Sequence, residues 1–260
     1  MTATACYTSG FFTQQQAGSL QSALRILPHV FDLVSPGSVV DVGCGVGTWL
    51  AAARTLGVLD VMGLDGDYVD RHLLQIPPDC FRATDLSRPF ECERTFDLAL
   101  SLEVAEHLPD TSAPALVESL TRLAPVVLFS AAIPKQCGEH HINLQWQSWW
   151  IDQFNSKGFV AVDCVRHRVW NDVAVEWWYA QNVFLIVRED RLASSPRLRQ
   201  ELAQSTWPYG IVHPRAYLER VASAEAGVPA GVRDWLAMGP RVTRATALRL
   251  WRRLSGEGFR

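Results

Sequence analysis

The sequence predicts an α/β protein in which a mostly parallel sheet is covered by helices on both faces. A buried run at Val39–Val42 ends in glycines at positions 43, 45 and 47. Short apolar runs recur at 59–64, 81–83, 96–101 and 126–131, and acidic residues follow several of them. A short apolar run that leads through a glycine-rich turn into a helix is typical of the first strand of a nucleotide-type fold.

Three segments are expected along the chain. Residues 1–36 form an N-terminal helical lid, because Gln14–Val34 has apolar residues at helical spacing, interrupted by Pro28. Residues 37–190 form the sheet domain, and residues 191–260 form an arginine-rich helical extension behind a hinge at 194–196. Tyr7 and Phe12 are candidate lid aromatics that line the substrate pocket, and plain hydrophobic contact with the domain surface explains them equally well.

The remaining elements follow from local signals. Helices are expected at 111–123, with Pro114 in the first turn, and at 146–156, closed by Gly158. Strands are expected at 159–165 and 182–187, the last one antiparallel at or near the edge of the sheet. Residues 241–254 form a basic amphipathic helix, which we expect to dock on a protein surface, either this chain's own or that of a second subunit in a homodimer. The alternative is that this helix lies on a membrane surface.

The glycine loop is suited to a cationic ligand. Gly43, Gly45 and Gly47 lack Cβ atoms, so the backbone can turn sharply and approach a ligand closely. Asp41 lies just before the turn, where its carboxylate can face a positive charge. The spacing differs from the Gly-x-Gly-x-x-Gly pattern of dinucleotide sites, which hold a diphosphate. This loop resembles the S-adenosylmethionine-binding loop of the class I methyltransferases.

The downstream residues agree with that resemblance. Asp65 ends the second strand about 20 residues after the loop, where an acid bonds ribose hydroxyls. The resemblance implies a Rossmann-like sheet of seven strands, S-adenosylmethionine as cofactor, and Asp85 beside the adenine ring. The expected cofactor-binding set is Asp41, Gly43, Cys44, Gly45, Gly47, Thr48, Asp65, Gly66, Asp85, Leu86, Ser101 and Leu102.

A second constellation, Glu103, Glu106 and His107, has the spacing i, i+3, i+4, which places all three side chains on one face of a helical turn. Carboxylates and an imidazole that converge in this way suit a divalent cation (Mg, Mn, Fe or Zn). A fourth ligand is expected from the loop after the fifth strand, where His140 and His141 are the candidates, because the loops after strands four and five are neighbours.

The Glu-x-x-Glu-His segment with a downstream histidine resembles the metal-binding set of small-RNA 2′-O-methyltransferases, and ubiquinone-biosynthesis O-methyltransferases carry a similar segment. That resemblance implies a metal held by Glu103, Glu106, His107 and His141, and His141 is the better match. Many class I methyltransferases carry this segment without a metal, and there the histidine acts as the base. Three interpretations stay open, namely a metal site, a metal-free histidine base and a structural role, and the catalytic candidates are His107, His141 and Glu106.

The expected reaction is O-methylation of a hydroxyl on a small or glycosylated metabolite of a natural-product or glycan pathway, with metal assistance. Trp146 and Trp149, at i, i+3 after the histidine loop, are the candidate pocket residues, because tryptophan faces stack on sugars. Core packing is the alternative role for such tryptophans. The alternative functions are 2′-O-methylation of an RNA 3′ end, metal-free methylation with His107 as base, and cofactor binding without transfer.

Charge and composition narrow the class of partner. Residues 1–190 carry a net charge of −10 and residues 191–260 a net charge of +7. An acidic catalytic body argues against an extensive nucleic-acid footprint. The six cysteines include no Cys-x-x-Cys pair, so neither a disulfide framework nor a zinc knuckle is indicated. We expect a cytoplasmic protein without a membrane span that acts on a small hydroxylated acceptor.

Overall fold

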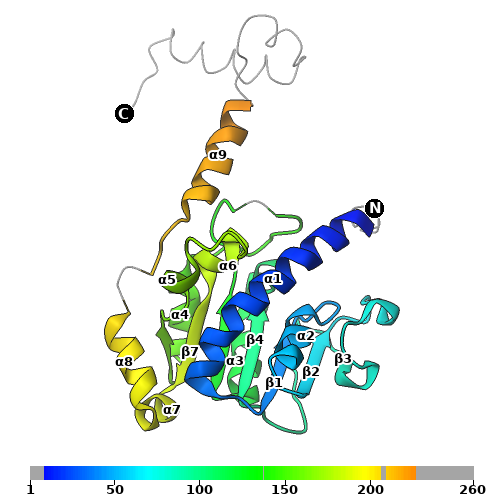
Figure 1. Cartoon of the computed structure of the whole chain (residues 1–260), viewed down its shortest axis with the longest axis vertical. Coiled ribbons are helices and arrows are strands. Elements are labelled where there is room, and N and C mark those ends of the chain that lie inside the picture. The colour runs from blue at the N-terminus through cyan, green and yellow to red at the C-terminus, as the bar shows by residue number, and fades with distance from the viewer. Residues whose placement is uncertain (1–8, 137, 206–208, 227–260) are drawn as a thin grey trace, which may run out of the picture. The chain divides into compact units, whose positions relative to one another are not determined.

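A computed structural model describes residues 9–136, 138–205 and 209–226. Its seven-stranded sheet has the order β3-β2-β1-β4-β5-β7-β6 (Figure 1). The strands are β1 (Ser38–Val42), β2 (Asp60–Asp65), β3 (Phe81–Ala83), β4 (Leu98–Leu102), β5 (Val126–Ser130), β6 (Phe159–Val162) and β7 (Phe184–Arg188). Strands β1 to β5 are parallel to one another, whereas β7 is antiparallel to both β5 and β6. The predicted fold class is confirmed, and β7 lies next to the edge strand β6.

The register aligns the carboxyl ends of four strands at one edge of the sheet. Asp41 of β1 pairs with Gly63 of β2, and Leu102 of β4 pairs with Ser130 of β5. Ligands of open α/β sheets bind at the carboxyl ends of the strands. The loops that follow β1, β2, β4 and β5 are therefore the ones that can build a site.

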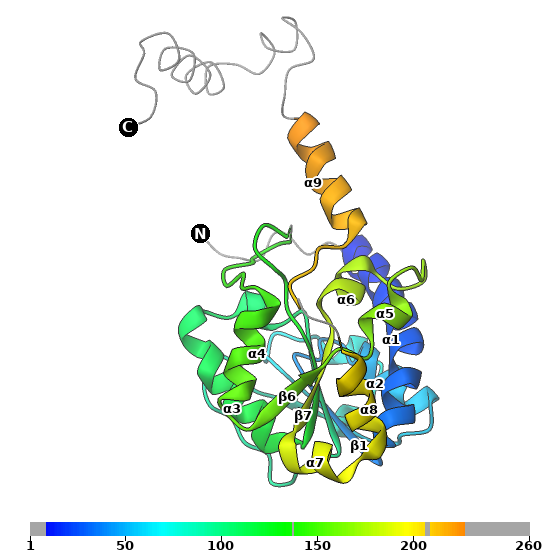
Figure 2. The ribbon, with the colours of Figure 1, turned by 90° about the vertical axis from the view of Figure 1, so that its left-hand side faces the viewer.

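Helices cover both faces of the sheet (Figure 2). One face packs against α1 (Ser9–Val34), α2 (Thr48–Thr55), α5 (Arg166–Val169), α6 (Trp177–Asn182) and α8 (Pro196–Gln204). The other face packs against α3 (Ala113–Leu123) and α4 (Gln147–Asn155). Because both faces are covered, β4 and β5 are buried at every position and have no polar alternation.

Helix α1 continues through Pro28, so the predicted interruption at this residue is wrong. A proline inside a helix removes one backbone hydrogen bond, usually at a cost of several kcal/mol. Here Ile26, Leu27 and Val30 are fully buried on either side of the proline. Packing of this apolar stretch against the sheet domain offsets the lost bond.

The last two strands are shorter than predicted: β6 ends earlier and β7 (Phe184–Arg188) begins later. Strand β6 ends at Val162 rather than at 165, and residues 163–183 instead form α5, α6 and the turns around them. Asn182, expected to open the last strand, is the final residue of α6. Both helices are shorter than two turns, and such short helices give no hydrophobic periodicity that could reveal them.

Residues up to His213 belong to one compact unit, and a second unit begins at Pro214 with α9 (Pro214–Ala226). Helix α7 (Glu189–Ser194) leads into α8, where Leu198 is fully buried. The segment expected to be a hinge lies inside the compact unit, where the Ser195 hydroxyl caps α8 by accepting a hydrogen bond from the Leu198 N–H (3.3 Å). The predicted helix at 241–254 lies outside the described residues.

Arg166 holds the segment around Tyr209 against the compact unit. Its guanidinium is buried, pairs with both carboxylate oxygens of Asp163, and lies 4.1 Å from the centre of the Phe184 ring. The same side chain donates to the carbonyl oxygens of Tyr209 (2.8 Å) and Gln181 (3.2 Å). Removing one partner of a buried ion pair is strongly destabilising, so this arginine fixes residue 209 against α6 and β7.

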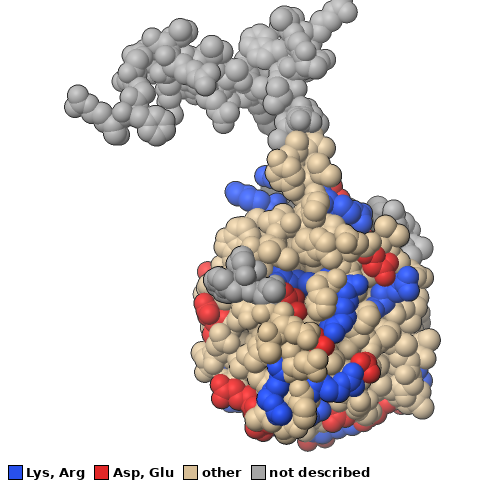
Figure 3. Space-filling view, turned by 60° about the vertical axis from the view of Figure 1, so that its left-hand side comes forward, with Lys and Arg blue, Asp and Glu red and all other residues tan. Residues whose placement is uncertain are grey.

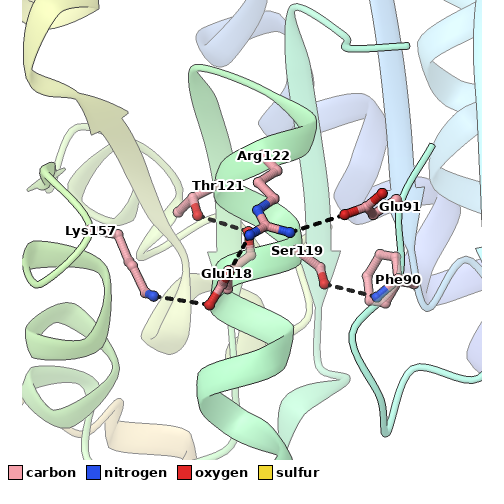
Figure 4. A network of polar contacts seen from close by, with 7 residues as sticks. All are labelled: Phe90, Glu91, Glu118, Ser119, Thr121, Arg122 and Lys157. Carbon is pink, nitrogen blue, oxygen red and sulfur yellow. Dashed lines mark hydrogen bonds and ion pairs between the residues drawn. The ribbon is translucent and has the colours of Figure 1, made fainter. Parts of the chain in front are cut away.

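The outer surface carries charges of both signs. Acidic and basic side chains are interspersed on the face shown in Figure 3. On α3, Glu118 binds both Arg122 (2.5 Å) and Lys157 (3.1 Å), while Arg122 also reaches Glu91 (3.1 Å) (Figure 4). Exposed pairs of this kind contribute about 0–1 kcal/mol each. Among the described helices, none is long and apolar enough to cross a membrane.

Candidate active site

The glycine loop leaves open space at one position only. A Cβ at Gly43 would lie 2.3 Å from Val104, and one at Gly47 would lie 2.9 Å from Ile76, whereas one at Gly45 would meet nothing within 4 Å. All three glycines have a positive φ, of 85°, 53° and 84° in chain order. Gly43 and Gly47 are therefore needed for close packing, and the open side of Gly45 is accessible to a ligand.

Asp65 ends β2 beside this loop, as predicted. One carboxylate oxygen accepts from the Gly45 N–H (2.6 Å), and the other accepts from the Gly66 N–H (2.7 Å) and the Tyr68 hydroxyl (2.6 Å). The backbone donors hold the carboxylate in one orientation. The bond from Tyr68 shows that a hydroxyl donor reaches this carboxylate, which is the interaction that a ribose hydroxyl would make.

Asp41 is a buried carboxyl group in β1, just before the loop. Burial, and then the negative charge of Asp65, raise the pKa of Asp41 from its usual value to about 8. Among the described residues, no lysine or arginine forms an ion pair with it. A cationic ligand would therefore relieve an electrostatic cost that the protein alone leaves in place.

Four other expected cofactor residues, Cys44, Thr48, Ser101 and Leu102, are buried. Cys44 is buried, and burial raises the pKa of its thiol, so this side chain packs rather than reacts. Thr48 opens α2, Leu102 is buried, and the Ser101 hydroxyl is a buried group without a hydrogen-bond partner among the described residues.

Asp85 is an exposed residue just after β3, next to Thr84, whose N–H donates to the Asp65 carbonyl (2.7 Å). Its exposed carboxylate accepts from the backbone and side chain of Ser87 and pairs with Arg88 (3.3 Å). These hydrogen bonds lower the pKa of Asp85. The next residue, Leu86, is buried in the core. Asp85 therefore caps a surface turn after β3.

Glu103 lies outside the cluster formed by the other potential metal ligands, although its carboxylate contacts that of Glu106. Its φ is +56°, which reverses the chain direction before a 3₁₀ turn at Ala105–His107, so the expected single helical face does not form. The Glu103 carboxylate instead accepts from the Gln136 amide (3.2 Å) and the Asn182 amide (3.2 Å). Burial raises its pKa to about 7, although hydrogen bonds from Ser130 and Asn182 act in the opposite direction.

Glu106, His107 and His141 do converge. Their potential ligand atoms lie within 4.8 Å of one another, and the two imidazole rings are 5.0 Å apart. Glu106 is fully buried, and neither of its carboxylate oxygens forms a hydrogen bond of normal geometry among the described residues. Burial, and then the charge of Glu103, raise the pKa of Glu106, whereas burial lowers the pKa of His107 and of His141.

Backbone hydrogen bonds bring the histidine loop to this turn, as expected from the neighbouring strands. The N–H groups of Ile142 and Asn143 both donate to the Glu106 carbonyl (2.9 and 3.1 Å). Gly138 allows the approach of His141, since a Cβ there would lie 2.1 Å from the imidazole ring. The choice between the two adjacent histidines falls on His141, because His140 is exposed and outside the cluster.

The structure describes the side chains of two of the four expected pocket aromatics, and these two differ in exposure. Trp146 precedes α4 and is 45% exposed, while Trp149 is half-buried and lies edge-on to Trp150 (4.8 Å between ring centres). Phe12 lies in α1, but its side chain, like all of Tyr7, lies outside the described residues. No sequence pattern singles out the amides of Gln136 and Asn182 that hold Glu103.

Comparisons with known proteins place the chain in a family. Residues 14–182 match the model of the methyltransferase domain. The sugar N-methyltransferase KedS8 of Streptoalloteichus sp. ATCC 53650 has a similar structure, with a TM-score of 0.53, 14% identity, and coverage of 72% of this chain and 98% of that one. DesVI of Streptomyces venezuelae gives a TM-score of 0.51 and 17% identity, with 68% and 95% covered. No protein of curated function matches the sequence. Taken with the glycine loop and sheet order, these matches show that the chain belongs to the methyltransferase domain family and is a class I, S-adenosylmethionine-dependent methyltransferase.

Proposed function

We propose that this enzyme transfers a methyl group from S-adenosylmethionine to a hydroxyl of a small or glycosylated metabolite, and that a divalent metal assists. The observation that carries the proposal is the convergence of Glu106, His107 and His141 at the carboxyl ends of β4 and β5. Hydroxyl groups are poor nucleophiles when neutral, and a bound divalent cation lowers the pKa of an oxygen that it contacts.

The residues at the end of β1 and β2 fit the cofactor. S-adenosylmethionine supplies an electrophilic methyl group and carries a sulfonium and an ammonium. Asp41 offers a buried carboxylate that lacks a cationic partner, and Gly45 leaves room for close approach. Asp65 is oriented by two backbone N–H groups and already accepts a bond from a hydroxyl. We assign these three residues to the cofactor.

The residues at the end of β4 and β5 fit a metal ion. Neither buried carboxylate oxygen of Glu106 forms a hydrogen bond of normal geometry among the described residues, and the Nδ1 atom of His141 is likewise buried without one. The Glu106 carboxylate also lies against that of Glu103, and a bound cation would reduce the repulsion between them. Leaving a buried polar group unpaired costs about 1–3 kcal/mol, which coordination would relieve. Two imidazoles and one carboxylate suit Mn, Fe or Zn better than Mg, which prefers oxygen ligands. Glu106, His107 and His141 would hold the ion.

The chain itself orients the groups of the site. The loop at 138–146, bonded to the Glu106 carbonyl, sets His141 beside His107. Alignment of reacting groups can supply roughly 7–11 kcal/mol of barrier reduction. Because burial lowers its pKa, His107 is neutral at pH 7 and can either bind a metal or take a proton. The metal-free alternative therefore keeps His107 as the base.

A small acceptor fits the surroundings better than RNA. Ile142 and Trp146 are exposed apolar residues on the histidine loop and at the start of α4, which favours an acceptor with an apolar part. RNA binding needs a basic stripe, whereas residues 1–190, which include the site, carry a net charge of −10. These features support a hydroxylated metabolite.

The test compares metal-stripped and metal-loaded enzyme, using labelled S-adenosylmethionine and a panel of sugars and phenols. We expect chelation to suppress transfer and Mn²⁺ to restore it. Glu106→Gln should weaken Mn²⁺ binding and transfer by at least about tenfold, while cofactor binding is retained. Glu118→Gln is the matched control, because it makes the same exchange in an exposed ion pair on α3 (Figure 4).

Full turnover by enzyme shown to be metal-free would refute metal assistance. In that case His107→Ala should cause a large loss and Glu106→Gln only a modest one, which identifies His107 as the base. Methylation of the amines in the panel, with no transfer to hydroxyls, would refute O-methylation itself.

A further inference from the structure

Tyr68 is an exposed aromatic residue whose hydroxyl lies on the carboxylate that we assign to the cofactor. The residue is 82% exposed, yet its hydroxyl donates to Asp65 (2.6 Å), which is itself buried. A turn closed by the bond from the Val69 N–H to the Gly66 carbonyl (3.3 Å) brings the tyrosine back toward the end of β2. Its ring lies against Gly66, where a Cβ would be only 2.1 Å from it. The absence of a side chain at Gly66 therefore allows this contact.

The Asp65 carboxylate accepts three hydrogen bonds from the described residues. Its Oδ1 atom accepts from the Gly66 N–H (2.7 Å) and from the Tyr68 hydroxyl, while its Oδ2 atom accepts from the Gly45 N–H (2.6 Å). A carboxylate offers about four lone-pair positions, two on each oxygen. One hydroxyl of a ligand can therefore bind at Oδ2 beside Tyr68. The two hydroxyls of a ribose need a further position, and all those on Oδ1 are filled.

Of these three donors, Tyr68 is the one that a ligand can displace. The other two are backbone N–H groups, and the first two N–H groups of the glycine loop also donate to the Leu64 carbonyl (2.7 and 3.3 Å), which ties the loop to β2. Tyr68 needs only a side-chain rotation, because most of its surface is already in solvent. Asp65 keeps its orientation without the tyrosine, since both backbone bonds remain. Loss of the tyrosine hydroxyl therefore frees the carboxylate and does not misalign it.

We propose that the Tyr68 hydroxyl takes the place of a ribose hydroxyl in the cofactor-free enzyme, and that S-adenosylmethionine binds by displacing it from Asp65. This inference rests on the proposed assignment of Asp65 to the cofactor, and it is independent of metal assistance and of the acceptor. Binding exchanges one bond between a hydroxyl and the carboxylate for another, which offsets part of the affinity that the ribose contributes. The ribose is common to S-adenosylmethionine and S-adenosylhomocysteine, so Tyr68 lowers the affinity for both and favours release of the product.

The test uses the full chain and calorimetry with S-adenosylhomocysteine and its 2′-deoxy analogue. Tyr68→Phe removes the hydroxyl and keeps the ring. We expect this variant to bind S-adenosylhomocysteine about threefold to tenfold more tightly than the wild type, because one hydrogen bond no longer competes. Its affinity for the 2′-deoxy analogue should stay within about twofold of the wild type, because a single hydroxyl needs only the position at Oδ2. Tyr217→Phe, the same exchange at an exposed tyrosine of α9, is the matched control and should leave both affinities unchanged.

A crystal structure of the complex with S-adenosylhomocysteine is the second measurement. Both ribose hydroxyls should lie within hydrogen-bond distance of the Asp65 carboxylate, and the Tyr68 hydroxyl should lie beyond it. Unchanged or weaker binding of S-adenosylhomocysteine by Tyr68→Phe would overturn the inference. An equal gain for the 2′-deoxy analogue, or a complex in which Tyr68 keeps its bond to Asp65, would overturn it as well.

Asp65→Ala separates the inference from the assignment on which it rests. This variant should bind S-adenosylhomocysteine at least about tenfold more weakly than the wild type, while its melting temperature verifies the fold. Unchanged affinity would refute the assignment of Asp65 to the cofactor and the displacement of Tyr68 with it. A loss of affinity in Asp65→Ala with no gain in Tyr68→Phe would refute the displacement alone.

Discussion

Asp41 should release a proton when the cofactor binds. Its carboxyl group is buried, and its pKa in the free protein is raised to about 8. An ammonium or sulfonium placed beside it favours the charged form and lowers that pKa. Binding therefore requires the proton to leave, and the affinity for S-adenosylhomocysteine, which keeps the ammonium, should rise as the pH rises.

The size of the effect follows from the pKa. With a pKa of about 8, roughly nine-tenths of the free protein is protonated at Asp41 at pH 7, so binding should release about 0.9 proton. The ionised fraction grows about thirtyfold between pH 5.5 and pH 7, so the dissociation constant should fall by up to about thirtyfold over this range. Asp41→Asn should bind more weakly at pH 7 and lose most of this dependence.

Calorimetry in buffers of different ionisation enthalpy measures the released proton directly. The wild type should give a slope near the expected value at pH 7, and Asp41→Asn a slope near zero, while its melting temperature and spectrum verify the fold. The same comparison with S-adenosylmethionine adds the sulfonium. A wild type that releases no proton, or a variant that releases as many protons, would refute the assignment of Asp41 to the cofactor's cation.

Two further predictions concern the loop and the C-terminal region. Gly45→Val should abolish cofactor binding, because the valine side chain closes the open side of the loop. Gly57→Val is the control: this glycine also has a positive φ and open space around it, so the variant should lose comparable stability and retain cofactor binding. If calorimetry gives Gly45→Val the same cofactor affinity as the wild type, the glycine loop does not bind the cofactor. Truncation after His213 should leave a folded and active unit, while truncation after Ser194 removes buried α8 and should lower the melting temperature by several degrees. Inactivity of the longer fragment, together with a change in its mass in solution, would instead show that the extension completes a dimer.

The elements that the sequence predicted well are those with a strong local signal. The glycine loop and Asp65 were placed correctly because a tight turn needs positive φ values and because carboxyl ends of parallel strands meet at one edge. The approach of His141 to His107 followed from the same rule, applied to β4 and β5. The general geometry of parallel sheets therefore allows the positions of the glycine loop, Asp65 and His141 to be predicted from the sequence pattern.

Glu103 shows where pattern reasoning stops. The spacing of Glu103 and Glu106 suits one helical face, but a left-handed φ at Glu103 precedes the turn, and the Glu103 carboxylate is held by amides from distant segments and lies outside the cluster of Glu106 with the two histidines. A positive φ at a glutamate has no sequence signature. Gln181 and Asn182 were missed for a related reason, since buried amides acquire a role only through partners that are distant in the chain.

The position of β7 in the sheet determines the order in which strands can pair as the chain is synthesised. In the sheet β6 pairs only with β7, so the earlier of these two strands waits without a partner until the later one has emerged. The parallel strands β1 to β5 need no such delay. Gln181 and Asn182 lie directly before β7 and depend on His213 for their orientation. Because the glycine loop and Asp65 emerge well before β7, a nascent chain should form its cofactor cradle first and the amide network around Glu103 last.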